Sequence, residues 1–566
     1  MEDFQTIVWI VVGVIWLISS IRNQLKAKSQ QPPAQELTPA EEVEWDDVWK
    51  QEPALPQAVG AVVELVTPEP AAPATPSMSA ERLRIKSQVD RLIADAEQLV
   101  VVARVDWATM RVAQTIDDFV LPHAKLIKAD AERIDESELY KLRAPFDEVE
   151  FVYSVIETMI QQRRNPALRK DLGDADQLAS ACYQPIIDFA TAGRIHLSTS
   201  TPVTMLAGKS DLGILTGFIP TGIAPIFLPP YFLKKVVWWP ALAHEVAHDF
   251  LAAATGAEAR MRAQLGLPSE EVGLLFLNIG HEGLTFDELY KIFGGWFEEI
   301  FCDVFGTLMI GPAYGYTMVE LFASPADPAA VSRINIDARG DRLAPHPPRH
   351  LRLKTVANIL SAVGEDEAAE ELVAEWQGIH GVPETIDLPL RGGGAVTVPM
   401  GIMEELLGEV CSRLYREQMH GLNGHALFDI PGVDYGPHEA AEVRRAKNEF
   451  ILGNAPTEHS ARAVIGGLVL AWRQAMHREA EFLALAHHAI VGVTEHHEDI
   501  HDNAFDIPTS SVESTPGDQP STVEALVLHT LLGPPHAVRD MARRRGQSNA
   551  AVGSGIVNAA HTRWRR

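Results

Sequence analysis

The segment PALAHEVAHDF, residues 240–250, places two histidines and a glutamate in a stretch that is otherwise mostly apolar. His244 and His248 are four residues apart. On an α-helix they are therefore about 40° apart around the axis and ~6 Å apart along it, so both imidazoles can bind one metal ion. Glu245 is displaced by one residue and lies beside the ion, where a general base for an activated water is needed. The segment predicts a buried helix with a metal-binding face, and Asp249 is expected to face outward.

A catalytic zinc site needs a third protein ligand, and the segment WFEEIFCDVFG, residues 296–306, offers acidic candidates. Glu299 and Asp303 are one helical turn apart among large apolar side chains, and a cation would explain a buried acidic pair. Glu299 is the predicted ligand, and Asp303 is predicted to accept a hydrogen bond from a ligand histidine. Glu298 is the adjacent alternative, but its i+4 partner is Cys302, which gives no such support. The plainer alternative is that both glutamates are solvent-facing helix charges.

The motif HExxH followed by an ExxxD helix resembles the gluzincin metallopeptidases, which have the thermolysin-like arrangement. The segment HPPRHLR, residues 346–352, is similar to the HPxxxxR element of a membrane-associated branch that includes the CAAX prenyl proteases and the heat-shock membrane zinc proteases. The resemblance covers residues 240–353. It implies a zincin-like core with Zn²⁺ on His244, His248 and Glu299. It also implies that His346 helps to stabilise the tetrahedral intermediate and that Arg352 has a supporting role.

The substrate side of such a site needs two further features. An oxyanion needs a donor besides the metal, for which His346 is the first choice and Tyr314 or Tyr316 are the reserves. Zincins also pair the substrate backbone with an edge strand. Either RIHLSTS, residues 194–200, or the segment near IAPIFLP, residues 223–229, is expected to supply that edge.

A second copy of the histidine spacing, HEDIH at residues 497–501, lacks this setting. The surrounding TEHHEDIHDN is polar throughout, Asp499 occupies an interior motif position, and no ExxxD helix follows. The segment is therefore interpreted as a chance match. The neighbouring histidines, including His487 and His488, are expected to lie on a solvated helix face.

The amino terminus carries FQTIVWIVVGVIWLISSI, residues 4–21, an apolar stretch about as long as the ~20 residues that cross a bilayer. Glu2 and Asp3 precede it, whereas Arg22, Lys26 and Lys28 follow it. A signal peptide would begin with basic residues, so the stretch predicts a single-pass membrane anchor. The basic flank is expected to stay in the cytoplasm, which places the catalytic region there as well.

The amino-acid composition indicates which binding partners and which redox compartment to expect. The net charge of −28 repels nucleic acid, so nucleic acid is not expected to bind. The chain has three cysteines, a sparse and odd set that fits a reducing compartment rather than a disulfide framework.

The chain is expected to be mainly α-helical, with a small α+β zincin-like catalytic core and a single N-terminal transmembrane helix. The predicted parts follow one another along the chain: an anchor (1–28), a Pro/Ala/Glu-rich linker (29–78), a helical domain (79–192), the metallopeptidase core (193–365), a C-terminal helical region (366–506) and a loosely ordered tail (507–566).

These observations predict a membrane-anchored zinc metallopeptidase that hydrolyses a protein or peptide substrate with Glu245 as general base. Two alternatives remain open. One is a membrane-tethered interaction or scaffold protein with a degenerate or structural metal site, against which the intact Glu245 argues. The other is a zinc hydrolase that acts on a non-peptide amide or ester.

Overall fold

The computed structural model describes residues 78–104, 107–195, 197, 201–207, 213–214, 223–268, 285–323, 325–334, 343–390 and 394–501, without the side chains of 491–501. Every described residue lies in one unit of the chain, Pro76–Arg566. The predicted anchor, nearly all of the linker and the predicted tail therefore lie outside the described residues. No helix within the described ranges combines the length and apolar character needed to cross a membrane.

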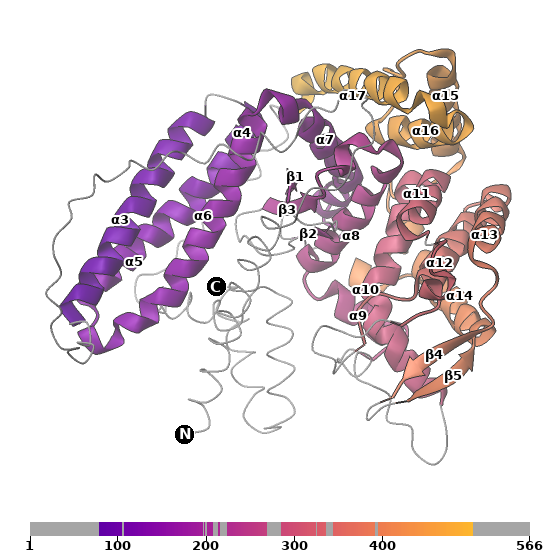
Figure 1. Cartoon of the computed structure of the whole chain (residues 1–566), viewed down its shortest axis with the longest axis horizontal. Helices are drawn as coiled ribbons and strands as arrows, with labels where there is room; N and C mark the ends of the chain where they lie inside the picture. The colour runs from indigo at the N-terminus through magenta and orange to yellow at the C-terminus, as the bar shows by residue number, and fades with distance from the viewer. Residues whose placement is uncertain are drawn as a thin grey trace, which may run out of the picture. The chain divides into compact units, whose positions relative to one another are not determined.

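The described part of the chain is mainly helical, as predicted. Its first portion is a bundle in which the helices run alongside one another and share one apolar cluster (Figure 1). The elements of this bundle are α3 (Met78–Ala103), α4 (Trp107–Thr115), the π-helical turn η1 (Ile116–Val120), α5 (Leu121–Arg133), the 3₁₀ turn η2 (Glu136–Leu142) and α6 (Arg143–Arg164).

A small mixed sheet follows the long helix α7 (Pro166–Thr191). Its strands are β1 (Thr201–Leu206), β2 (Gly213–Ile214) and β3 (Ile223–Leu228). The central strand β3 pairs in parallel with β1 and antiparallel with β2. Alternate residues of a strand face opposite sides, so Val203 and Met205 join the bundle cluster while Ile226 and Leu228 join a second, larger core.

The larger core surrounds a group of buried helices and extends from Leu168 to Ile490, across the boundaries predicted at 192/193 and 365/366. Its central elements are α8 (Ala241–Ala253), α9 (Ala257–Gln264), α10 (Phe286–Ile310), α11 (Pro312–Phe322) and α12 (Arg349–Ala362). Helix α8 packs against α7, α10, α11 and β2, so it has neighbours on several sides. This burial explains the apolar sequence around the histidines.

The remaining elements complete the same core (Figure 1). They are α13 (Asp366–His380), the antiparallel hairpin of β4 (Thr385–Pro389) and β5 (Ala395–Pro399), α14 (Met400–Arg416), α15 (Pro437–Leu452), α16 (Ala461–Gln474) and α17 (Glu479–His501). Short 3₁₀ turns lie at Phe232–Lys234, Val236–Trp238, Pro328–Val331, His420–Leu422, Leu427–Asp429 and Met476–Arg478.

Helix α10 begins earlier than the glycines suggest. Gly294 and Gly295 precede the apolar run and look like a boundary, but the helix passes through both and starts at Phe286. Thr285 and Glu288 form a capping box that satisfies the first free N–H groups. A Cβ at Gly294 would lie 3.1 Å from the carbonyl oxygen of Pro268, which is closer than an ordinary van der Waals contact. The glycine therefore serves close packing within the helix rather than ending it.

The outer edge of β1 is paired with side chains instead of another strand. The Gln162 amide donates to the carbonyl of Leu206 at 2.7 Å and accepts from its N–H at 2.8 Å. Arg163 donates to the Thr204 carbonyl at 2.8 Å, and Asp176 accepts from the Thr204 N–H at 2.6 Å. These contacts satisfy both backbone groups of alternate residues, as a neighbouring strand would.

Replacement of Gln162 by leucine should destabilise the protein. It would leave the buried N–H and C=O of Leu206 without partners, at a cost of about 2 kcal/mol. The exposed neighbour Gln161 provides the matched control, and Gln161→Leu should change stability by less than about 0.5 kcal/mol. Denaturant unfolding of the two variants checks this. Equal unfolding midpoints would show that the Gln162 amide does not support the strand edge.

Candidate metal centre

His244 and His248 project from one face of α8 with their Nε2 atoms 3.2 Å apart. The Nδ1 atom of each ring faces a carboxylate of α10. His244 Nδ1 is 3.0 Å from Asp303 Oδ1, and His248 Nδ1 is 3.0 Å from Glu298 Oε1. A carboxylate at Nδ1 favours the tautomer that carries its proton there. Both Nε2 lone pairs then point at each other, an arrangement that a cation between them would stabilise.

The Glu299 carboxylate reaches the same point from α10. Its Oε2 is 3.4 Å from His244 Nε2, and its Oε1 is 3.6 Å from His248 Nε2. Ligands about 2.0–2.1 Å from a tetrahedral zinc ion are about 3.3 Å from one another. The two distances, together with the 3.2 Å between the imidazole nitrogens, fit that spacing. In addition, Glu299 Oε2 is buried and accepts no hydrogen bond from a described residue.

Asp303 is fully buried and connects the site to three other helices. Its carboxylate accepts from Arg352 of α12 through Nε at 2.8 Å and Nη2 at 2.7 Å. It also accepts from the Tyr314 hydroxyl of α11 at 2.7 Å and pairs with His244 of α8. Gly306 makes the tyrosine contact possible, because a Cβ there would lie 2.8 Å from the Tyr314 ring.

Two residues of the HPPRHLR segment lie at the site. Arg352 is buried, and its Nη1 is 3.3 Å from Glu299 Oε2 while its guanidinium stacks over the Phe322 ring. His346 precedes α12, and its Nε2 is 3.3 Å from Glu299 Oε1. The His346 side chain is 56% exposed, in contrast to the buried histidines of α8. His346 is therefore the histidine of the cluster that solvent reaches most easily.

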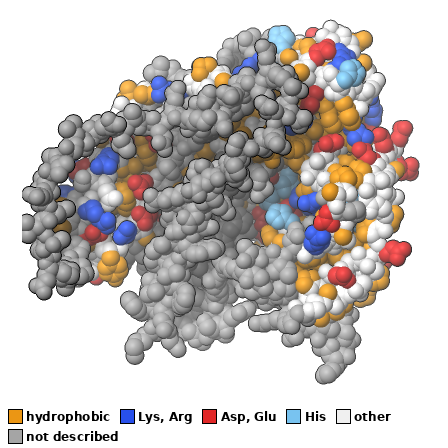
Figure 2. Space-filling model, in the orientation of Figure 1, with side chains coloured by type: hydrophobic (Ala, Val, Ile, Leu, Met, Phe, Trp, Pro, Cys, Tyr) orange, Lys and Arg blue, Asp and Glu red, His pale blue; other side chains and the backbone are white. Residues whose placement is uncertain are grey.

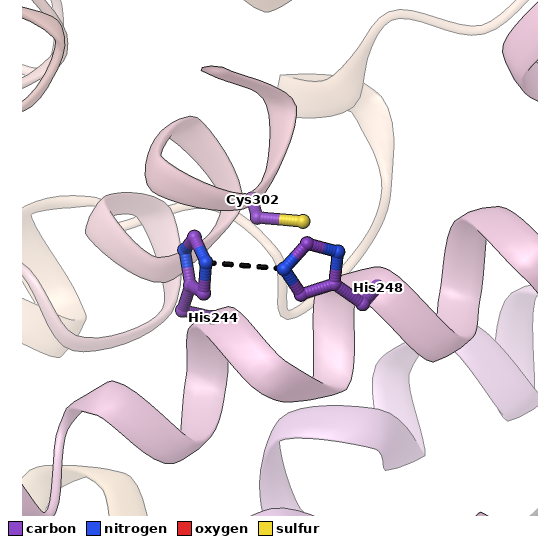
Figure 3. A group of neighbouring side chains, drawn as sticks. All are labelled: His244, His248 and Cys302. Carbon is purple, nitrogen blue, oxygen red and sulfur yellow. Dashed lines mark hydrogen bonds between the residues drawn. The ribbon is translucent and has the colours of Figure 1, made fainter. Parts of the chain in front are cut away.

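Cys302 also reaches the histidine pair. It is fully buried on α10, one turn beyond Glu298, and its sulfur lies within 4.8 Å of a nitrogen of each histidine. Figure 3 shows the two rings of α8 facing each other and the cysteine side chain extending over them from the other helix. The residues that surround the two Nε2 atoms thus include a thiol as well as a carboxylate.

The electrostatics of the cluster are those of a cation site. Burial and the Arg352 guanidinium lower the pKa of His244, but the carboxylates of Asp303 and Glu299 outweigh them and raise it above its ordinary value. Burial raises the pKa of Glu299, but Arg352 and the two histidines outweigh it and hold that pKa well below its usual range. Three carboxylates, those of Glu298, Glu299 and Asp303, contact the two histidines, and one guanidinium pairs with two of them, so neutral imidazoles leave an excess of negative charge. A bound cation would offset that excess.

Several residues lie elsewhere than the sequence predicted. Asp249 is 1% exposed, so the expectation that it faces outward is wrong, because α8 is covered by α7, α10 and other elements on its sides. The Tyr314 hydroxyl is 3.2 Å from His244 Nδ1, on the ring edge that faces Asp303 and opposite the edge that faces His248. Tyr316 donates to Glu371 at 3.0 Å, away from the cluster.

The substrate-edge candidates also differ from expectation. Strand β3, which contains most of IAPIFLP, is central and pairs on both sides. Of RIHLSTS, residues 196 and 198–200 lie outside the described residues, and Leu197 forms an isolated antiparallel bridge with Ala254. Within the described sheet, β2 occupies the edge opposite to β1.

The histidines near the second motif have different surroundings. His488 is exposed, as expected, but His487 is 8% exposed and pairs with Asp174 and Asp171 of α7, so a solvated position for it is wrong. Its Nδ1 contacts Asp174, and its ring meets Trp239 edge-on. The backbone of HEDIH is helical in α17, but its side chains lie outside the described part of the chain.

Sequence reasoning missed the contacts of Glu298, Cys302 and Tyr314 at this site. The sequence did contain a signal for Glu298. Glu298 and Cys302 are four residues apart, just as Glu299 and Asp303 are. Which of two adjacent stripes on a helix faces a partner depends on how that helix is rotated, and spacing alone does not give the rotation.

The comparisons with known proteins identified no relative of this chain. A scan against protein-family models gave no match, and searches of curated proteins and of solved structures gave none either.

Loss of the Glu298 carboxylate should weaken zinc binding. Glu298→Gln removes the charge that orients His248 through Nδ1, and such a change in an outer partner costs about 10–100-fold in metal affinity. Asp287→Asn changes an exposed acidic residue on the same helix and should leave the affinity unchanged. Competition with a zinc-sensitive dye measures both dissociation constants. If the two variants bind zinc equally well, Glu298 does not support the metal site.

Proposed function

We propose that this protein is a zinc-dependent metallopeptidase of the gluzincin type, with Zn²⁺ held by His244, His248 and Glu299. One observation carries the proposal. Two imidazole nitrogens and one carboxylate converge with separations of 3.2, 3.4 and 3.6 Å, close to the spacing of about 3.3 Å around a tetrahedral zinc ion. This donor set of two histidines and a glutamate is the one found in catalytic zinc sites of this type.

The residues behind the ligands support the same proposal. Asp303 and Glu298 hold the two rings by their Nδ1 atoms, which directs both Nε2 atoms toward the ion. Arg352 compensates charge at Asp303 and Glu299 and fixes their orientation. Since these groups are buried on packed helices, the ligand set is preorganised.

In the proposed mechanism, a bound zinc ion supplies Lewis acidity that polarises the scissile carbonyl and lowers the pKa of a water toward about 7. The Glu245 carboxylate removes a proton from the attacking water and later passes it to the leaving amine nitrogen. The imidazole of His346, the exposed histidine next to Glu299, donates a hydrogen bond to the oxygen on which negative charge develops.

The proposed substrate is a protein or peptide, and the proposed location is the cytoplasmic side of a membrane to which residues 4–21 anchor the chain. The apolar character of this segment and its basic flank support the anchor. A strongly acidic chain makes nucleic acid an unfavourable partner. On the face drawn in Figure 2, acidic and basic side chains are interspersed over the described surface.

A second candidate function has one observation in its favour. Cys302 lies at the histidine pair, and thiolate ligands are typical of structural zinc sites, in which four protein ligands enclose the ion. A scaffold protein with such a site would have the same histidine geometry. The position of Glu245 beside the ligand histidines favours the peptidase. A zinc hydrolase of non-peptide amides would use the same residues.

The full-length chain should contain one zinc ion that depends on the α8 histidines. His244→Ala/His248→Ala should abolish zinc binding, and Glu299→Ala should weaken it, because each change removes a direct ligand. The control is the double variant His497→Ala/His501→Ala, which removes two histidines of the same spacing from α17 and should retain the metal. Elemental analysis of the purified proteins measures zinc per chain. Zinc that follows the α17 histidines instead would contradict the proposal.

Removal of the general base should separate chemistry from metal binding. Glu245→Gln is expected to retain zinc while hydrolysis of an unfolded protein such as casein falls by at least about 100-fold. Glu288 of α10 is unsuitable as a control because it caps the helix, so the exposed Asp287 is changed instead, as Asp287→Asn. If Glu245→Gln contains zinc and hydrolyses casein at the unaltered rate, Glu245 is not the base.

A further inference from the structure

The three cysteines of the chain are equally buried but have different neighbours. Burial raises the pKa of each thiol to about 12. Cys411 hydrogen-bonds with Thr355 and Asn358, and Cys182 lies within the apolar core formed partly by α7. Among the described residues, Cys302 is the cysteine that lies with two histidines in a group able to hold a metal ion. The three cysteines therefore differ in the residues that surround them and not in their exposure to solvent.

A second observation points to the same place. Glu299 is more than nine-tenths buried, and its Oε2 atom lies 3.4 Å from His244 Nε2 and 3.3 Å from Arg352 Nη1. The thiol of Cys302 approaches the two histidines from the same helix and is a hydrogen-bond partner of His248. A carboxylate and a thiol on α10 thus converge on the histidine pair of α8.

Resting on the metal site proposed above, we propose that Cys302 is a fourth protein ligand, which completes a set of His244, His248, Glu299 and Cys302 around the ion. The sulfur would then lie about 3.6 Å from each nitrogen, since Zn–S and Zn–N bonds are about 2.3 and 2.0–2.1 Å. The sulfur and one nitrogen of each ring lie within 4.8 Å of one another in the structure. On binding, the S–H bond breaks, its proton passes to solvent, and a sulfur–metal bond forms without any change of oxidation state.

The consequence is a closed metal centre. Structural zinc sites have four protein ligands, whereas catalytic sites leave one position for water or substrate. With Cys302 bound, no position remains, so hydrolysis requires this thiolate to leave the ion. Cys302 would therefore act as an internal inhibitor whose displacement opens the site.

Cobalt substitution of the full-length chain tests the proposal without a substrate. Co²⁺ bound to a thiolate gives an intense near-ultraviolet charge-transfer band, and Co²⁺ bound only to nitrogen and oxygen does not. We expect the band in the unaltered protein, in Cys182→Ser and in Cys411→Ser, but not in Cys302→Ser or Cys302→Ala. Zinc affinity should fall by at least about 10-fold in both Cys302 variants, since even an outer partner contributes that much.

Acetohydroxamate reports whether a coordination position is free. It should shift the visible bands of cobalt in Cys302→Ala and leave those of the unaltered protein unchanged. Cobalt that binds to the unaltered protein without a charge-transfer band would overturn the role of Cys302 and leave the histidine and glutamate site intact. Failure of the unaltered protein to bind cobalt or zinc would overturn both the metal site and this inference.

Discussion

The buried carboxylate of Asp303 connects four helices at the centre of this protein. It lies on α10, accepts two hydrogen bonds from Arg352 of α12 and one from Tyr314 of α11, and pairs with His244 of α8. A fully buried charge is stable only when it is paired and hydrogen-bonded. The positions of α8, α11 and α12 around α10 are therefore coupled to one side chain, and the orientation of the face of α8 that carries His244 and His248 depends on it.

The hydrogen bonds and ion pairs around Asp303 are compatible with a metal ion at the histidine pair. Each histidine of α8 has a carboxylate at Nδ1, and so each offers Nε2 to the space beside Glu299. Burial lowers the pKa of both histidines, but Asp303 and Glu299 raise the pKa of His244 above its ordinary value, and Cys302, Glu298 and Glu299 do the same for His248. Metal binding would displace protons from the two rings, so affinity for the metal should fall as the pH falls. The packing of apolar helices around the cluster limits the entry of water that would otherwise screen these charges.

Much of the site could be predicted from spacing, and the failures have specific causes. An α-helix completes one turn every 3.6 residues, so residues four apart lie on the same face. This places His244 and His248 on one face of α8, and Glu299 and Asp303 on one face of α10. The contact of Glu298 with His248 was not predicted, because two adjacent glutamates are both within reach of a partner helix when its rotation is unknown. Gly294 lies inside α10, where it packs closely against Pro268, and a glycine pair in the sequence does not by itself distinguish such packing from a helix end.

The sequence alone predicted the mainly helical fold and the pairs of side chains that share a helical face. These features depend on local periodicity and on apolar burial, which a single segment carries. Only the tertiary structure decided which faces meet. It brought Arg352 onto Asp303, placed the Cys302 sulfur beside the histidine pair and buried Asp249. Those contacts join residues that are distant in sequence, or they depend on which elements surround a helix. They are determined by the rotation and packing of the helices and not by a local sequence pattern.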